Sequence, residues 1–328
     1  MKKLDGLLVT EWEGKEVEKA GFLKEDILSI LQLDKFRMII DLIKKNHGVD
    51  IDYTKIDVED KNVYETLFHQ GYTEDVFQFG TEGLKKYCKY LKPDRFEELI
   101  VANAIYRPGA MLPGAHLEYA KIKKGEVEAT FDYLLEDVTK DTLGLYIFQE
   151  TVMKAFQVIT DSTLEEADMF RKIITKLSVA SAHTDANYEK YRSLFVNTYI
   201  KKGCDSEVAE DVWQKLIAHS SYSFNRSHAA CYAYEGYVCN FFKLYYPIEF
   251  WITALKYAKD ENVEKMILEI TTLGDIHLFP PDINKSAKEY TYDKDRLIIY
   301  WALSSVKFAG DKSVDDVMTE REKNGKFL

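Results

Sequence analysis

Apolar residues recur at helical spacing along most of the chain. Within 26–46, Ile27, Leu31, Met38 and Leu42 fall on one stripe, which is typical of a helix that packs on a core. The same pattern predicts further helices that start at Asp94 and that cover 146–160, 162–177, 184–201, 206–219 and 227–245, with Pro247 opening the next one. Asp94 and Ser227 are predicted as N-caps, because a short polar side chain can accept a hydrogen bond from the first turn of a helix.

Strands are predicted in only two short segments. VFQF (76–79) reads as a short strand, and 289–300 alternates around Asp293-Lys294-Asp295 as a hairpin does. No internal repeat, low-complexity segment or flexible linker interrupts the helical pattern. The predicted fold class is therefore mainly α with small β insertions (α+β).

The composition is that of a globular protein of about two domains, with 328 residues, 46% hydrophobic and 30% charged. The net charge of −11 excludes a protein that grips nucleic acid with its whole surface. No run approaches the ~20 apolar residues of a membrane span, and the N-terminus lacks a signal-peptide core. Cys88, Cys204, Cys231 and Cys239 form no CxxC pair. We expect reduced thiols and a cytoplasmic protein.

Charge is unevenly distributed along this acidic chain. The segment 171–243 holds ten Lys or Arg against seven Asp or Glu. Such an excess indicates either a focused anion site or ordinary solvated helix faces.

The sharpest local feature is the start of the predicted helix at 227. Asn225, Arg226, Ser227 and His228 would place a guanidinium and an imidazole beside the unpaired N–H groups and the positive dipole end of that helix. This combination favours a phosphate site. The alternative is a Ser-capped helix with a surface Arg and a packed His.

A second cluster of cations lies in ADMFRKIITK (167–176). Arg171 and Lys172 come about one helical turn before Lys176, so the three side chains lie close enough to repel one another unless a polyanion neutralises them. A solvated helix face is an equally open interpretation.

Three further residues are weaker candidates. Gln149 interrupts a mostly apolar segment, and Arg107 precedes a Pro-Gly turn that could present its side chain from a rigid loop. Asp26 stands just before a helical run, where an aspartate is usually an N-cap.

Taken in order, these segments resemble one family, the family C DNA polymerases, which includes the alpha subunit of bacterial DNA polymerase III and its phage relatives. The resemblance runs collinearly from about residue 16 to 328. It is carried by AGFLKEDIL, VYETLFHQGYTEDVFQFGTEGLKKY, FEELIVANAIYRPGA, LYIFQETVM, EEADMFRKIITK, SYSFNRSHAACYAYEGY, PIEFWITAL and FPPDINKSAKEY.

The resemblance implies roles for the candidate residues. Asp26 aligns with the third catalytic carboxylate of the palm, a ligand of the two-metal Mg²⁺ site, whose other two aspartates would be supplied from outside this chain. The resemblance also implies a set of fingers residues that face the triphosphate of the incoming nucleotide. These nucleotide-binding residues are Arg171, Lys172, Lys176, Asn225, Arg226, Ser227 and His228, with Arg107 and Gln149 as less certain members.

It also implies a division of the chain. Residues 1–31 would be the last piece of the palm, 32–275 the helical fingers, and 276–328 a small α/β end of the fingers that leads toward a helix-hairpin-helix and clamp-binding region beyond Leu328.

The sequence departs from the family pattern at several of these positions. Lys172 stands where the family has Arg, Thr175 replaces Gly, Arg226 replaces Lys, and Glu25 replaces a hydrophobic residue. Arg and Lys differ in how they grip phosphate, so the fine geometry of the site is expected to differ too.

The expected function is that of a fragment or split chain of a replicative DNA-directed DNA polymerase. It would bind the incoming dNTP and primer-template for Mg²⁺-dependent nucleotidyl transfer and be inactive alone. Its expected partners are DNA, dNTP, a palm and thumb polypeptide and, through parts outside this chain, the sliding clamp; no membrane is expected. It would lie in the cytoplasm of a bacterial cell or phage-infected bacterium. The alternative is a non-catalytic DNA-binding or replisome-assembly module derived from the fingers.

Overall fold

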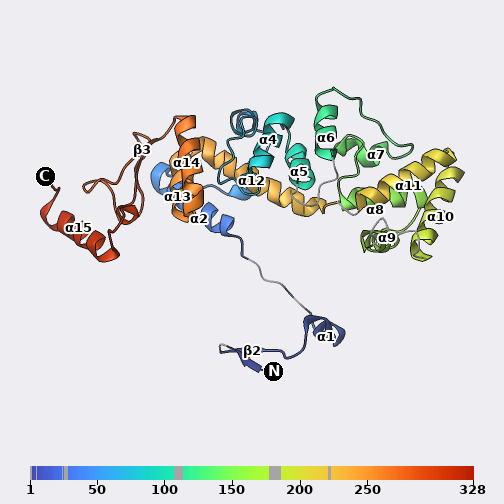
Figure 1. Cartoon of the computed structure of the whole chain (residues 1–328), viewed down its shortest axis with the longest axis horizontal. Helices are drawn as coiled ribbons and strands as arrows, with labels where there is room; N and C mark the ends of the chain where they lie inside the picture. Colours follow the sequence, from blue (N-terminus) through green and yellow to red (C-terminus); the bar gives the residue numbers. More distant parts are fainter. Residues whose placement is uncertain are drawn as a thin grey trace.

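The computed structural model describes residues 2–4, 6–23, 25, 29–106, 114–176, 186–220 and 223–328. Most of these residues are helical, which confirms the mainly α fold class. Figure 1 shows an elongated body in which successive groups of helices lie side by side along the long axis.

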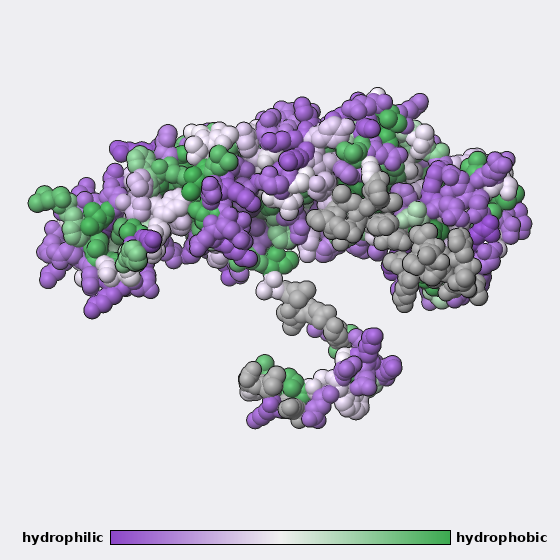
Figure 2. Space-filling model, in the orientation of Figure 1, coloured by the Kyte–Doolittle hydropathy of each residue, from purple (hydrophilic) through white to green (hydrophobic). Residues whose placement is uncertain are grey.

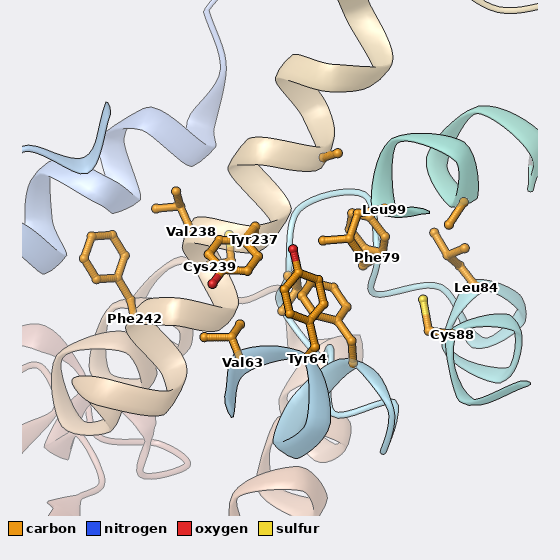
Figure 3. Close-up of a cluster of buried hydrophobic side chains, with 14 of the residues drawn as sticks. Val63, Tyr64, Phe79, Leu84, Cys88, Leu99, Tyr237, Val238, Cys239 and Phe242 are labelled. Carbon is orange, nitrogen blue, oxygen red and sulfur yellow. The ribbon is translucent and has the colours of Figure 1, made fainter. Parts of the chain in front are cut away.

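The larger of two hydrophobic cores surrounds the long helix α12. Tyr237, Cys239 and Phe242 of α12 are fully buried, and Figure 3 shows them with Tyr64 and Phe79. The helices around this core are α2 (Leu31–His47), α3 (Lys61–Val63), α4 (Glu82–Leu91), α5 (Phe96–Ile105), α6 (Ala115–Lys123), α12 (Arg226–Tyr245), α13 (Pro247–Tyr257) and α14 (Asp260–Leu273), with a 3-10 turn, η1 (Tyr53–Lys55), and a π-helical turn, η2 (Tyr64–Phe68).

A second core lies between four helices at one end of the body. Phe156 and Phe170 stack with ring centroids 4.0 Å apart, and Trp213 is fully buried beside them. The elements around this core are α7 (Glu136–Thr139), η3 (Lys140–Thr142), α8 (Gln149–Thr160), α9 (Leu164–Lys176), α10 (Ala186–Lys201) and α11 (Ser206–Ser220).

The C-terminal segment forms a small three-stranded sheet with order β3-β5-β4, followed by η5 (Leu303–Ser305) and α15 (Asp311–Asn324). β4 (Thr291–Asp293) pairs antiparallel with β5 (Ile298–Tyr300), so that Tyr292 faces Ile299, and this confirms the predicted hairpin. β3 (His277–Phe279) pairs parallel with β5, a pairing that the local alternation did not predict.

The N-terminal segment consists of an antiparallel pair, β1 (Lys2–Leu4) and β2 (Leu7–Val9), and a short helix, α1 (Gly14–Lys19). It lies apart from the helical body in Figure 1, and no residue of α1 is buried. Leu8, Trp12 and Phe22 are exposed. The predicted division of the chain at residues 31 and 275 stays a prediction.

The predicted strand at 76–79 is wrong. The segment 73–79 forms two consecutive turns, closed by hydrogen bonds from Val76 N to Thr73 O (3.2 Å) and from Phe79 N to Val76 O (3.0 Å). Asp75 and Gln78 have left-handed backbones, with φ of 55° and 62°, which a strand does not allow. Val76 and Phe79, three residues apart, are therefore buried by a turn and not by a strand.

Both predicted N-caps are also wrong. The cap of α12 is Asn225, whose Oδ1 accepts from His228 N at 2.8 Å, while Ser227 lies in the first turn. The cap of α5 is Arg95, with no side-chain cap bond, and Glu98 reaches back to accept from Asp94 N at 2.8 Å. The bond that caps α12 therefore spans three residues, from His228 back to Asn225, and the bond before α5 spans four, from Asp94 to Glu98. The prediction that Pro247 opens a helix is confirmed at the start of α13.

Among the described helices none is long and apolar enough to span a membrane.

The surface in Figure 2 is mostly hydrophilic, in agreement with the charged composition. Hydrophobic surface is visible at the end that carries α15, where Phe308 and Val306 are exposed.

Candidate phosphate-binding site

Two helix N-termini lie side by side at the junction of the two cores. Phe148 and Phe224 form a parallel bridge, in which Phe224 N donates to Ile147 O (3.1 Å) and Gln149 N donates to Phe224 O (2.9 Å). The first turn of α8 is thereby fixed beside the first turn of α12. The periodicity of either segment alone gives no sign of this bridge.

A carboxylate already lies at the N-terminus of α12. Glu150 Oε2 accepts from Arg226 N at 2.9 Å, and Glu150 Oε1 accepts from Asn225 Nδ2 at 2.9 Å. An anion is stabilised at this position because the first N–H groups of a helix lack partners within it and the helix dipole is positive there. Glu150 thus accepts two hydrogen bonds at the start of α12 that a phosphate oxygen could also accept.

Arg226 presents its guanidinium at the same place. Its Nη2 lies 3.4 Å from Asp141 Oδ2, and its Cζ lies 5.5 Å from the centre of the Phe148 ring. The pair with Asp141 is half exposed, so it contributes little to stability. A hollow of about 390 Å³ borders Arg226 and is lined also by Asp137, Glu150 and Lys154.

Arg171 reaches the same junction from α9. Its Nε and Nη2 donate to Asp168 Oδ1 (3.0 and 2.8 Å), and its Nη1 donates to Gln149 Oε1 at 3.4 Å. Gln149 in turn donates from Nε2 to Ser223 O at 3.3 Å. Arg171 is therefore linked to the segment before α12 through one carboxamide.

Lys172 shares the acidic partner of Arg171. Its Nζ lies 2.7 Å from Asp168 Oδ2, and the side chain is largely exposed. The hydrogen bonds from Lys172 and Arg171 lower the pKa of the Asp168 carboxyl. Asp168 therefore stays ionised and partly neutralises this basic pair.

An aromatic row leads away from the start of α12. The His228 ring lies 4.0 Å from that of Tyr232, and Tyr232 lies 5.1 Å from Phe77 in an edge-to-face contact. Ser227 and His228 are both exposed. The row brings the turn around Phe77 next to the candidate site, which sequence reasoning missed because Tyr232 and Phe77 are far apart in the chain.

Hydrogen bonds and the Phe148–Phe224 bridge place Gln149 and Arg171 next to the segment that leads into α12. Nucleotide binding by these residues stays a prediction. Asp26 and Arg107 lie outside the described residues, and so does the side chain of Lys176, the last residue of α9. Sequence reasoning missed the counter-ions Glu150, Asp141 and Asp168. For Asp168 the spacing of three and four residues to Arg171 and Lys172 is a signal that could have been used.

The described residues do not form a metal site. Nowhere in the described part of the chain do three His, Cys, Asp or Glu side chains gather so that they could hold an ion.

Comparison with known proteins settles the family. The family description "Bacterial DNA polymerase III alpha subunit finger domain" matches residues 32–203, which is more than half of the chain. The chain belongs to this family. The helix-hairpin-helix motif matches residues 275–328, so a segment of that kind is found within the chain, where the sequence analysis expects it only after Leu328.

Full-length relatives extend the similarity over nearly the whole finger-domain chain. This chain is 32% identical over 324 residues to DNA polymerase III subunit alpha of Aquifex aeolicus, and the match covers 98% of this chain and 27% of the relative. For the same subunit of Campylobacter jejuni the identity is 34%, over 98% of this chain and 26% of the relative. For the subunit of Staphylococcus aureus the identity is 30%, over 100% of this chain and 30% of the relative. The chain thus spans between a quarter and a third of the length of these relatives.

Proposed function

We propose that this chain is the part of a DNA-directed DNA polymerase that holds the triphosphate of an incoming dNTP beside the primer-template. The observation that carries the proposal is the bridge between Phe148 and Phe224, which sets the first turns of α8 and α12 together. Arg171 and Arg226 border this junction from two further directions. Family membership supports the same assignment.

The contacts at the junction describe how a triphosphate would be held. A phosphate oxygen would take the place of Glu150 on Arg226 N, and the guanidinium groups of Arg226 and Arg171 would turn from Asp141 and Asp168 to the phosphates. Each charge-assisted hydrogen bond contributes ~1.5–3 kcal/mol before desolvation. The site residues act by binding and orientation, so that negative charge on the phosphates is balanced where it lies.

Catalysis would need carboxylates from outside the described residues. Asp26 is the one that we propose as a Mg²⁺ ligand in this chain, with the remaining ligands supplied by a palm segment outside it. Fingers and palm together would then transfer the nucleotide to the primer.

The test is dNTP binding by variants of the complete chain. Arg171→Ala and Arg226→Ala should each weaken dNTP binding about tenfold or more, since 1.4 kcal/mol corresponds to a factor of ten. Arg192→Ala is a matched control, because Arg192 also pairs with two carboxylates, Glu189 and Glu210, but lies on α10. Titration calorimetry should show less than about a twofold effect for this control. Equal effects at all three positions would contradict the proposal.

A second candidate is a non-catalytic module that binds DNA. It is favoured by the helix-hairpin-helix match at residues 275–328 and by the carboxylates that already pair with Arg171, Lys172 and Arg226. The two candidates are separated by comparing the effect of removing one arginine on dNTP binding, about tenfold under the triphosphate proposal, with its effect on the salt dependence of duplex binding. Under the triphosphate proposal, removing one arginine changes the salt slope by at most about one unit. Under the alternative, removing one arginine would change the affinities for duplex and for dNTP by equal, small factors.

A further inference from the structure

A hollow of about 250 Å³ opens where the start of α2 meets the turn segment 73–79. Its polar lining comes from Gln32, Lys35 and Asp75, and its apolar lining includes Ile30, Val76 and Phe77. It shares no lining residue with the hollow beside Arg226. The two hollows are therefore separate features of the molecule.

The Gln32 side chain is buried beside this hollow without a partner. The residue is 6% exposed, and within the described part of the chain it makes no side-chain hydrogen bond. A carboxamide has two donors and an acceptor, and leaving them unpaired in a buried position costs free energy. Because Gln32 lines the hollow, a ligand that enters the hollow meets this amide.

The first turn of α2 adds backbone donors at the same place. Ile30 is the N-cap and makes no side-chain cap bond. The first N–H groups of a helix have no partner within it, and the positive end of the helix dipole lies there. Leu31 and Gln32 are the first two residues of this 17-residue helix, so their N–H groups favour an anion beside them.

A buried ion pair completes the polar lining. Lys35 Nζ donates to both carboxylate oxygens of Asp75, at 2.6 and 2.8 Å, and both side chains are largely buried. Because an ammonium group has three donors, one remains for a ligand. Both oxygens of Asp75 accept, so the carboxylate can take further donors but offers none. Burial raises the pKa of the Asp75 carboxyl, whereas Lys35 opposes that shift.

The backbone that carries Asp75 is fixed from beneath. Asp75 has a left-handed φ of 55°, a conformation that asparagine and glycine also adopt. Lys243 of α12 has a fully buried side chain and donates from Nζ to Tyr72 O (3.2 Å) and Glu74 O (2.7 Å). The carboxylate is therefore in place before a ligand arrives.

These groups together specify the chemistry of the ligand. The donors of Leu31, Gln32 and Lys35 require oxygens that accept hydrogen bonds. The carboxylate of Asp75 repels an anion unless the anion brings a proton to it. A phosphate group that carries one proton supplies both features, whereas sulfate carries no proton near neutral pH.

We propose that this hollow binds a protonated phosphate group, with its oxygens on the donors of Leu31, Gln32 and Lys35 and its hydroxyl on Asp75. The phosphate is either inorganic phosphate or a phosphomonoester whose substituent lies against Val76 and Phe77. This site is independent of the proposed function, because it uses none of the residues at the start of α8 or α12.

Titration calorimetry with potassium phosphate and potassium sulfate tests the site. The complete chain carries Arg226→Ala, which weakens phosphate binding at the other hollow. In this chain phosphate should bind about fivefold more tightly than sulfate, and Gln32→Leu should weaken phosphate binding about fivefold or more. Gln70→Leu is the control, since Gln70 is exposed and lies outside the hollow, and it should change the affinity less than about twofold.

Asp75→Asn tests the demand for a proton. Asparagine tolerates the left-handed backbone, and its amide can donate as well as accept. Sulfate should then bind within about twofold of phosphate. A retained preference for phosphate would overturn the role of Asp75. If Asp75→Asn does not fold, as judged by circular dichroism, Gln32→Glu replaces it and should abolish phosphate binding through the added negative charge.

Phenyl phosphate distinguishes the two sources. Tighter binding than inorganic phosphate would support a phosphomonoester, and weaker binding would support free phosphate. Equal phosphate binding with and without Gln32→Leu, or none in the Arg226→Ala chain, would overturn the inference and show that the hollow holds water only. Either result would leave the triphosphate proposal intact, because that proposal is tested by dNTP binding at Arg171 and Arg226.

Discussion

Under the proposed function, Glu150 would both hold the donors of the phosphate site in place and compete with a phosphate for them. Its carboxylate accepts hydrogen bonds from Arg226 N and Asn225 Nδ2, two donors that a bound phosphate would use. The binding free energy of a phosphate here would therefore be the difference between the energy of its own contacts and that of the contacts that Glu150 loses.

Glu150→Gln should raise the affinity of the chain for inorganic triphosphate severalfold. The glutamine amide oxygen can still accept from Arg226 N, but the negative charge that repels a polyanion is gone. Titration calorimetry measures the change. Glu166→Gln is the matched control, because Glu166 also bonds the N-terminus of a helix, through Thr163 N at 2.8 Å. An unchanged or lower affinity for Glu150→Gln would show that this carboxylate does not compete with the ligand.

At the scale of elements, the start of α12 is set by one carboxamide. Asn225→Ala removes the acceptor for His228 N and should lower the free energy of unfolding by about 1 kcal/mol. Ser227→Ala should cost less than about 0.5 kcal/mol, because Ser227 is an exposed residue of the first turn. Urea denaturation followed by circular dichroism compares the two. A larger loss of stability for Ser227→Ala than for Asn225→Ala would show that Ser227 is the cap, as the sequence predicts.

Long periodic helices could be predicted from the sequence because their stripes are set by burial, as for α2 and α8–α12. The exact caps could not, since Asn225 and Ser227 are both good capping residues and the choice depends on Glu150 from another helix. The turn at 73–79 reads as a strand in sequence because Val76, Phe77 and Phe79 are residue types that favour strands. Its left-handed residues are held by Lys35 and Lys243, which are distant in sequence.

The candidate site could be predicted in part. Arg171, Gln149 and the segment 225–228 were singled out from residue type and family resemblance, and the structure places them at one junction. The three carboxylates that pair with the cations could not be assigned in this way. An acidic residue on a helix surface looks the same in sequence whether it faces water or a guanidinium.

At the scale of the whole molecule, we expect no DNA synthesis by this chain alone on a primed template with Mg²⁺ and dNTPs. The family resemblance assigns one palm carboxylate, Asp26, to this chain, and one carboxylate does not hold two metal ions in the geometry of in-line transfer. Adding a palm and thumb segment in trans should restore primer extension, and Asp26→Asn should abolish it with little change in DNA affinity. Extension assays on a denaturing gel measure this. Template-dependent synthesis by the pure chain would contradict it.

One connection in the molecule has a mechanical consequence. Phe148 belongs to the core around α12, and Val152, four residues later, belongs to the core around α8–α11. A rotation of one core against the other would therefore bend α8 between Phe148 and Val152, next to the contact of Glu150 with Arg226. Under the triphosphate proposal, binding at that junction and the angle between the cores would be thermodynamically linked. A second ligand that tilts the cores would then change triphosphate affinity by the same factor by which the triphosphate favours the tilt.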